Sequence, residues 1–529
     1  MTNKTLAGLG TLIVIAFLVI TFSENNRDQI TPQVDLTIGQ KTSTEIVDEI
    51  SIEGTLDTKQ EVLTKESDVT TKETDINVEQ EVLTDNPDKT TIETNIPSEQ
   101  EFSTNDPDEI SARTSIITEK KTWDVIIIGA GIAGLATAEE LTKQGVDNVL
   151  ILEARDRIGG RIWTDTIGDN IPVDLGASWI HGVNGNPIAQ IVAENNITTV
   201  ATDYENEVEH TPGVLSNPVR GNLWEEFEDF AYDQDGRSIQ NNLEAFVEEE
   251  DLNKGEVDYL EYLINTTIEH ELGADVSNLS IKNYDGGKEL SGGDVLFPGG
   301  YDQIINILAQ NKNITLEQPV TSIDYSGELI SIETNSGDTF ITKQVVVTVP
   351  LGVLKKGYIT FDPQLPVQKR TVIDRLGMGV LNKTYLLFDE VFWEKDIEII
   401  GYVGKEKGHW AETLNLYPYT QEPILLMFNA GDYGTEIEQN SDQKTVNEAM
   451  NMLREIYGAN TPNPIDSVIT RWNKDQWSGG SYSYVPTGAS FDDYETLGES
   501  INDKFFLLVK QPTPTSPLPS MEPSYLVFE

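Results

Sequence analysis

The hydrophobic and polar positions divide the 529-residue chain into three zones. Residues 6–22 are almost continuously apolar, whereas residues 23–121 are polar with only scattered aliphatic side chains. From residue 122 onward, short runs of β-branched residues alternate with helical patterns. Alternation of this kind is typical of an α/β fold with a mainly parallel sheet. We therefore expect the packed core to begin near residue 122.

The first zone, residues 1–22, has the composition of a membrane anchor or signal segment, with its uncharged run at residues 6–22. Its seventeen uncharged residues place it between a long signal-peptide core and the shortest membrane-spanning helix. No Ala-x-Ala cleavage site follows, so we expect an uncleaved helical anchor in the membrane with the rest of the chain exported. A cleaved signal peptide, which leads to secretion, and a misassigned start are the alternatives.

The second zone, residues 23–121, is acidic and repetitive. It holds 24 acidic and 9 basic residues, a net charge of −15, and its single aromatic residue is Phe102. The motif Gln60-Glu-Val-Leu-Thr64 returns as Gln80-Glu-Val-Leu-Thr84 and, with two changes, as Gln100-Glu-Phe-Ser-Thr104, which gives three copies of a 20-residue repeat over 60–119. Such a segment cannot bury enough apolar surface to offset its ordering entropy. We expect a disordered acidic spacer.

The strongest chemical signal opens the third zone. A β-branched strand from Trp123 runs into Gly129-Ala-Gly-Ile-Ala-Gly134, a helix follows, and a second strand ends at Glu153. Gly129 and Gly131 let the backbone approach a pyrophosphate, and Gly134 packs the helix against the strand. The acid at the end of the second strand would bind the ribose hydroxyls. Gly129, Ala130, Gly131, Gly134 and Glu153 therefore predict a dinucleotide site of the Rossmann type.

The residues after Glu153 favour FAD over NAD. Arg155 and Arg161, with Gly160 between them, can donate paired hydrogen bonds to phosphate and adenosine oxygens. Further on, a turn of mostly small residues offers backbone for contact with a flat ring, and its predicted cofactor contacts are Ala177, Ser178 and Trp179.

From Trp123 toward the C-terminus the chain resembles the flavin-dependent amine oxidases, which include polyamine oxidases, monoamine oxidases and lysine-specific histone demethylases. The resemblance is greatest to the polyamine oxidases. It rests on the motifs Gly129-Ala-Gly-Ile-Ala-Gly134, Leu152-Glu-Ala-Arg-Asp-Arg-Ile-Gly-Gly-Arg161, Gly176-Ala-Ser-Trp-Ile-His-Gly182, Val349-Pro-Leu-Gly-Val-Leu354, Leu381-Asn-Lys383 and Trp477-Ser-Gly-Gly-Ser-Tyr-Ser-Tyr484.

The resemblance implies a Rossmann-type FAD-binding domain with an inserted α+β substrate-binding domain. The FAD-binding part is expected at about 122–194, 290–350 and 471–506, and the substrate-binding part at about 195–289 and 351–470.

The resemblance also implies oxidation of an amine C–N bond, with transfer of a hydride to FAD and reoxidation by O₂. Lys383 matches the lysine that holds a water beside the flavin, and Val320 matches a backbone contact to adenine. Tyr482 and His181 match residues that line the substrate pocket. Ser481 stands where monoamine oxidases have the cysteine that bonds the flavin, so the FAD is expected to be non-covalent.

The net charge and the composition limit which classes of ligand the protein is expected to bind. The net charge is −53, of which about −39 belongs to residues 122–529, so a nucleic-acid phosphate backbone is a poor partner. The chain has no cysteine, and its four histidines show no ligand spacing, so no metal site is expected. The excess of acidic over basic residues is compatible with a cationic amine as the substrate, most of all a polyamine.

The C-terminus departs from the resemblance after Phe506. The family continues into Ala-Gly-Glu-Ala-Thr and a flavin-binding helix, whereas residues 507–529 contain a proline-rich run that cannot form one. Reading from the third base of each codon permits Ala-Gly-Glu-Ala-Thr and later His-Gly-Ala at the family spacing. We therefore expect residues 507–529 to be a frameshifted tail. A catalytically impaired or non-catalytic amine-binding remnant, and another flavin oxidoreductase of the same fold, remain as alternatives.

Overall fold

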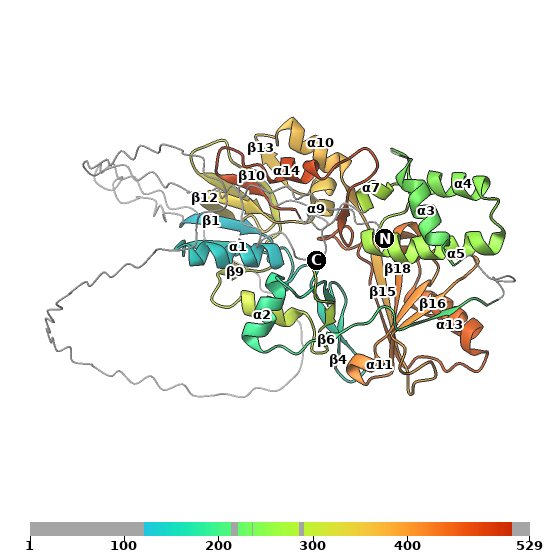
Figure 1. Ribbon diagram of the computed structural model, residues 1–529. Coiled ribbons are helices and arrows are strands. Elements are labelled where there is room, and N and C mark those ends of the chain that lie inside the picture. Colours follow the sequence, from blue (N-terminus) through green and yellow to red (C-terminus); the bar gives the residue numbers. More distant parts are fainter. Residues whose placement is uncertain (1–120, 213–220, 235, 285–289, 510–529) are drawn as a thin grey trace, which may run out of the picture. The chain divides into compact units, whose positions relative to one another are not determined.

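The computed structural model describes residues 121–212, 221–234, 236–284 and 290–509 (Figure 1). The predicted anchor at 6–22, the predicted spacer at 23–121 and most of the predicted frameshifted tail lie outside these residues and stay predictions. Within the described ranges, no helix is both long and apolar enough to cross a membrane.

The expected strand–helix–strand unit is present near the start of the described chain. Strand β1 (Thr122–Ile128) is followed by helix α1 (Ile132–Lys143) and strand β2 (Val149–Leu152), and β1 and β2 pair in parallel. The inner residues of β1 and all of β2 are buried, as β-branched runs between covered sheet faces should be. The α/β fold class is confirmed in this part.

The first sheet has eight strands in the order β13-β10-β11-β12-β1-β2-β9, with β21 also paired to β12. Strands β12, β1, β2 and β9 run parallel, whereas β10, β11 and β12 form an antiparallel meander. Its other strands are β9 (Ile314–Thr315), β10 (Val320–Asp324), β11 (Ile330–Thr334), β12 (Thr339–Val347), β13 (Thr360–Asp362) and β21 (Phe505–Leu507).

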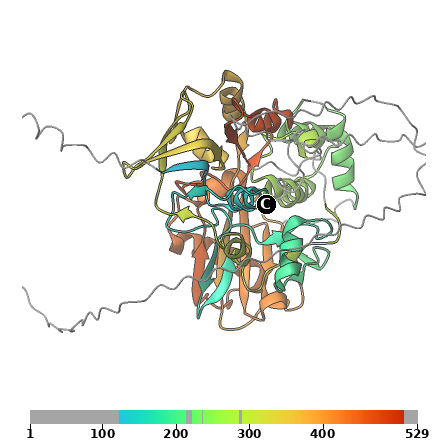
Figure 2. The same cartoon turned by 90° about the vertical axis from the view of Figure 1, so that its left-hand side faces the viewer.

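The second sheet has six strands in the order β19-β15-β18-β17-β16-β7. Its pairs are antiparallel except for β16 and β7, and β15 and β18 are almost entirely buried. Its strands are β7 (Glu207–His210), β15 (Leu381–Leu387), β16 (Ile399–Tyr402), β17 (Glu412–Asn415), β18 (Ile424–Ala430) and β19 (Asp466–Ile469). In Figure 2 the yellow strands of the first sheet and the orange strands of the second form separate groups.

Short strands and helices connect and cover the two sheets. The short strands are β3 (Thr164–Ile167), β4 (Ile171–Asp174), β5 (Trp179–Ile180), β6 (Val200–Ala201), β8 (Val295–Leu296), β14 (Gly377–Met378) and β20 (Ser483–Tyr484). The helices include α2 (Pro187–Asn195), α3 (Leu223–Tyr232), α4 (Ile239–Glu249), α5 (Lys254–Ile264), α6 (His270–Leu272), α7 (Ile281–Tyr284), α8 (Asp302–Leu308), α9 (Leu351–Lys356), α10 (Val367–Arg375), α11 (Tyr417–Thr420), α12 (Gly431–Ile437), α13 (Asp442–Tyr457) and α14 (Asp492–Gly498). A π-helical turn, Asn265–Glu269, joins α5 to α6.

One boundary differs from the predicted division of the chain. Residues 351–376 were expected in the substrate-binding part, but β13 pairs with β10 of the first sheet. Leu351, Val372 and Leu376 belong to the same hydrophobic cluster as Ile126 of β1. The apolar faces of α9 and α10 are buried on the first sheet, so the second group of elements resumes only after α10.

Candidate active site

The turn between β1 and α1 brings three glycines to the edge of the first sheet. A side chain at Gly134 would place its Cβ 2.0 Å from the Gly129 carbonyl oxygen, and one at Gly129 would place it 2.8 Å from Thr348 Oγ1. At Gly131 the nearest atom to a Cβ would be the Gly159 oxygen, at 3.9 Å. Gly129 and Gly134 are thus required by the protein's own packing, whereas Gly131 keeps open the space at the N-terminus of α1 where a phosphate can bind.

Glu153 lies at the end of β2, as the motif requires, with only 6% of its surface exposed. The backbone N–H of Ala130 donates to its Oε2 at 2.7 Å, and the N–H of Arg155 donates to its Oε1 at 2.9 Å. These bonds fix the carboxylate beside the glycine turn. Each oxygen keeps a lone pair that a ribose hydroxyl can use.

The two predicted arginines have different partners. Arg155 donates from Nη1 and Nη2 to the two carboxylate oxygens of Asp475, at 2.9 and 2.6 Å, so its charge is matched by an acid. Arg161 donates from Nη1 to the Ser481 carbonyl at 2.8 Å. Burial lowers the pKa of Arg161 to about 10, which still leaves it charged at neutral pH. Because Arg161 bonds to a neutral carbonyl and Arg155 to a carboxylate, Arg161 is the better candidate to bind a phosphate or the flavin.

Lys383 lies on β15 and is buried against the small-residue turn at 174–178. Its Nζ donates to the carbonyls of Asp174 and Gly176 at 2.9 and 2.6 Å, and to Ser178 Oγ at 2.5 Å. Three acceptors match the three hydrogens of the ammonium group. The lysine therefore holds the turn, including the predicted cofactor contacts Ala177 and Ser178, against the second sheet.

Asp174 is a buried carboxyl behind this turn. Burial raises its pKa to about 6, although Thr164, the N–H of Tyr301 and the charge of Lys383 act in the opposite direction. The Tyr385 hydroxyl, like Lys383, donates to the Asp174 backbone carbonyl, at 2.6 Å. The turn is thus held by hydrogen bonds to the Asp174 carboxyl group and by hydrogen bonds to the backbone carbonyls of Asp174 and Gly176.

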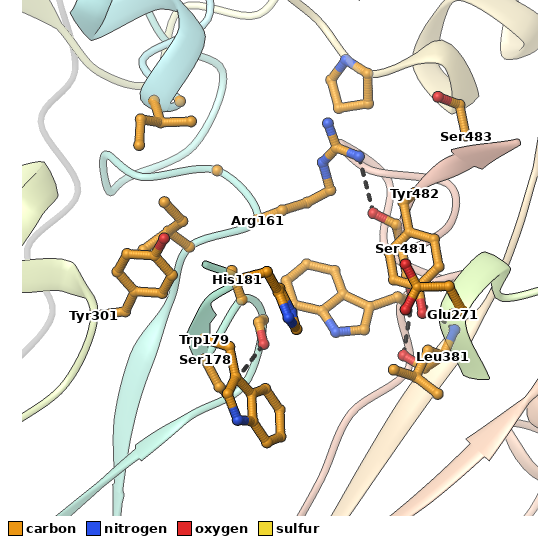
Figure 3. Close-up of a pocket in the computed structure, with 18 of the residues that line it drawn as sticks. Arg161, Ser178, Trp179, His181, Glu271, Tyr301, Leu381, Ser481, Tyr482 and Ser483 are labelled. Atoms are coloured by element: carbon orange, nitrogen blue, oxygen red, sulfur yellow. Dashed lines mark hydrogen bonds between the residues drawn. The ribbon is translucent and has the colours of Figure 1, made fainter. Parts of the chain in front are cut away.

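His181 extends from the same segment into the cavity (Figure 3). Its Nδ1 lies 2.5 Å from Asp294 Oδ2, and its ring stacks on Trp179 with centroids 6.2 Å apart. Burial acts to raise the pKa of Asp294, but the hydrogen bonds from His181, Gly182 and Tyr204 outweigh it and lower the pKa. The Asp294 carboxylate therefore orients His181. This partner, 113 residues further along the chain, is not apparent from the sequence.

Tyr482 and Ser481 approach from the opposite side. Figure 3 shows Tyr482 and Glu271 across the cavity from Trp179 and His181. The Tyr482 hydroxyl donates to the His270 carbonyl, which fixes the ring. Ser481 Oγ exchanges hydrogen bonds with the backbone of Leu381, at 2.9 Å in each direction. Because a serine side chain occupies this position, no thioether to a flavin can form here.

These elements surround one cavity of about 1240 Å³. Of the predicted site residues, only Ala130 and Gly134 do not line it; both act through the backbone and packing of the glycine turn. The remaining predicted residues are brought together on its wall: Gly129, Gly131, Glu153, Arg155, Gly160, Arg161, Ala177, Ser178, Trp179, His181, Val320, Lys383 and Tyr482. The open space at Gly131 and the fixed Glu153 carboxylate fit the predicted dinucleotide.

The cavity also contains polar residues that sequence reasoning missed. Glu207, Glu209, His270 and Glu412 line it, and the last three come from three separate elements. Along the sequence, His270 has no metal-ligand spacing to another histidine, and the three glutamates are ordinary strand residues. No local signal could have found them, since the pairing of distant strands brings them together.

The comparisons with known proteins agree with this geometry. Residues 132–282 and 271–508 match the model of a family described as flavin containing amine oxidoreductase. The chain is 33% identical to polyamine oxidase 2 of Arabidopsis thaliana, with 72% of this chain and 82% of the relative covered. It is 30% identical to lysine-specific histone demethylase 2 of Homo sapiens, with 72% of this chain and 50% of the relative covered.

A solved structure of putrescine oxidase bound to putrescine is similar in fold. Its TM-score is 0.62 at 18% sequence identity, and the match covers 74% of this chain and 93% of that chain. At this sequence identity, the structural similarity supports the assignment of the fold.

Proposed function

Because the chain belongs to the flavin containing amine oxidoreductase family, we propose that it oxidises polyamines at a C–N bond and passes the electrons to O₂. Its cofactor is FAD, which is not bound through sulfur because the chain contains no cysteine. When bound, FAD supplies the hydride acceptor of the reaction. The amine becomes an imine that water hydrolyses, and O₂ is reduced to H₂O₂.

The observation that carries the choice of substrate is the acidity of the cavity wall. Its acidic side chains outnumber its basic ones, which are Arg155, Arg161 and Lys383. Each of these three donates to a protein acceptor described above. The acids are Glu153, Asp203, Glu205, Glu207, Glu209, Glu271, Asp294 and Glu412. Such a wall raises the local concentration of cations.

Two acidic runs on the helices α3 and α4 do not contribute to this effect in the cavity. Glu225 and Glu226 lie in the first turn of α3, and Glu248 and Glu249 lie at the end of α4. None of the four lines the cavity. The carboxylates of the cavity wall instead come from strands of the second sheet (Glu207, Glu209 and Glu412), from α6 and from loops.

The aromatic side chains of the cavity prepare the amine for reaction. An ammonium group cannot release a hydride, so it must first lose a proton, and a desolvated site lowers the pKa of an amine. Trp179 and Phe428 lie with their ring centroids 6.1 Å apart, and Tyr482 approaches from the other side. Their faces can attract the cation on its way in.

Lys383 is proposed to hold a water beside the reacting atoms. All three of its hydrogens are already bonded, so a water must take the place of one acceptor. Ser178 Oγ is the acceptor that can leave by a side-chain rotation, and it lines the cavity. We therefore assign to Ser178 the role of sharing this lysine with a water.

The test uses the purified full chain supplied with FAD. We expect a yellow protein whose flavin absorbance is bleached by spermidine under nitrogen and restored by air, with release of H₂O₂. A panel of polyamines, diamines, monoamines and a methylated lysine peptide then ranks the substrates. Bleaching by the peptide or a monoamine in preference to polyamines would reject the polyamine assignment.

The C-terminal residues favour one second candidate, a chain that binds amines without turning them over. Leu507, Leu508 and Val509 line the cavity where the resemblance places Ala-Gly-Glu, and the later residues lie outside the described part. A colourless protein that still binds spermidine would support this candidate. Resequencing the codons around Phe506 decides whether the tail belongs to the intact gene.

A further inference from the structure

The second sheet aligns the missed polar residues with Lys383 in one cross-strand row. Lys383 of β15 pairs with Phe428 of β18, which pairs with Glu412 of β17. Glu412 pairs with Gly401 of β16, which pairs with Glu209 of β7. Residues directly opposite one another on neighbouring strands point to the same face. Lys383, Phe428, Glu412 and Glu209 all line the cavity on that face.

The row sets the separation between the two ends of the cavity. Neighbouring strands lie about 4.8 Å apart, so Glu412 is roughly 10 Å from Lys383 and Glu209 roughly 19 Å. An extended chain advances about 1.2 Å per bond, so about eight bonds span the first of these distances. A linear triamine has a second charged nitrogen at such a separation, whereas a monoamine has none.

The far end of the row is strongly acidic. Glu207 and Glu209 alternate on β7, and both face the cavity together with Glu412. Burial raises the pKa of Glu207, and the charges of Glu209 and Glu412 raise it further, because neighbouring like charges disfavour ionisation. The lining of this end contains no Lys or Arg among the described residues, because Arg155 and Arg161 lie at the glycine turn and Lys383 at the other end of the row.

His270 provides an independent sign of a missing ligand. It is only 8% exposed and lines the cavity, yet neither ring nitrogen has a hydrogen-bond partner within the described chain. Its Nδ1 lies 3.5 Å from Glu412 Oε1, too poorly placed for a hydrogen bond. A buried polar group without a partner is costly, and native structures rarely leave one.

Two local backbone features lie beside these groups: a π-helical turn before His270 and a glycine at position 401. A π-helical turn over Asn265–Glu269 directly precedes His270, and Thr266 and Thr267 from this turn also line the cavity. Such turns occur frequently at functional sites. On the sheet, Gly401 leaves room for Tyr262, since a Cβ there would lie 2.2 Å from the Tyr262 hydroxyl. Tyr262 thereby occupies the gap in the row between Glu412 and Glu209.

We propose that Glu412 and His270, together with Glu207 and Glu209, form a subsite for the remote ammonium group of a linear polyamine. A neutral imidazole nitrogen and the carboxylates accept hydrogen bonds, and a primary ammonium group has three to donate. Among the described residues, no group of three or more potential metal ligands converges. The subsite selects substrates by a second positive charge. This inference rests on the proposed function.

The test compares Glu412→Gln, Glu207→Gln and His270→Asn with the wild-type full chain. Glu225→Gln, which removes a charge from the exposed first turn of α3, is the matched control. Each protein is assayed with spermidine and with butylamine by peroxide release. Spermidine binding is also measured by calorimetry on protein whose flavin has first been reduced with dithionite under nitrogen, so that no hydride transfer can accompany binding.

In Glu412→Gln we expect about a ten-fold increase in the spermidine Kd and a similar fall in the ratio of kcat/KM for spermidine to that for butylamine. Glu412→Asp, which keeps the charge, should recover most of the ratio, and the control should match wild type. Spermidine binding that is unchanged in both Glu412→Gln and Glu207→Gln contradicts the subsite alone. Absence of spermidine binding to the wild-type chain contradicts the proposed function and the subsite together.

Discussion

Lys383 shows how one residue connects the two sheets at the site. It is placed by β15, and all three of its hydrogens bond to the turn that follows β4. The motif Leu381-Asn-Lys383 made this lysine a candidate, but the partners come from residues about 200 positions earlier. The sequence therefore indicates the residue, and the structure shows what it holds.

Replacing Lys383 with Met should slow the oxidation of spermidine by roughly 10- to 100-fold, because the turn loses its three hydrogen bonds and the proposed water its donor. Stopped-flow absorbance measures flavin reduction and reoxidation separately. Lys343→Met is a suitable control, since that lysine is exposed on β12 and pairs with Asp124. Unchanged rates of both half-reactions would exclude Lys383 from catalysis.

Asp174 should make stability depend on pH. Its pKa is raised by burial to about 6 in the folded chain from the ordinary value of 3.8. The folded chain therefore binds this proton more tightly, and the associated stabilisation is complete below about pH 4 and lost as the pH rises through 6. The difference between the folded and the ordinary pKa of Asp174 corresponds to about 3 kcal/mol of unfolding free energy.

Asp174→Asn removes the titrating group while keeping an acceptor for Thr164 and Tyr301. Urea unfolding of wild type and variant at intervals from pH 4 to pH 7 should show a steeper loss of stability in the wild type. Parallel curves would mean that Asp174 titrates normally.

At the scale of elements, the glycine turn between β1 and α1 separates packing from ligand binding. Gly134 meets the Gly129 carbonyl, whereas Gly131 has φ −73°, a value that any residue adopts, and faces open space. The same motif thus contains two glycines that packing requires, Gly129 and Gly134, and a third, Gly131, that packing does not require.

Gly131→Ala should leave the unfolding temperature within about 2 °C of wild type while reducing the flavin content of the purified protein. Gly134→Ala should lower both, because its methyl group cannot be accommodated beside the Gly129 oxygen. Flavin absorbance per chain and thermal unfolding of the two variants provide the comparison. If Gly131→Ala binds flavin as well as wild type, the phosphate does not approach this turn.

At the scale of the whole molecule, both sheets and the described lining of the cavity lie within residues 122–509. The acidic zone at 23–121 is predicted from its composition to be a disordered spacer. A chain that begins at residue 121 should therefore keep its flavin content, and its unfolding temperature should stay within about 2 °C of the full chain. Loss of either property would show that the acidic zone supports the fold.

The sequence by itself determined the family, the strand–helix–strand unit, the cofactor class and the wall residues that belong to contiguous motifs. These depend on short-range spacing, since a glycine turn and the acid that ends the next strand lie within 25 residues of each other. Tertiary structure decided the rest. The row from Lys383 to Glu209 joins five strands that are far apart in the chain, and only their register brings the carboxylates to one face. The burial of His270 without a hydrogen-bond partner for its ring nitrogens also depends on three-dimensional packing, which no pattern along the chain records.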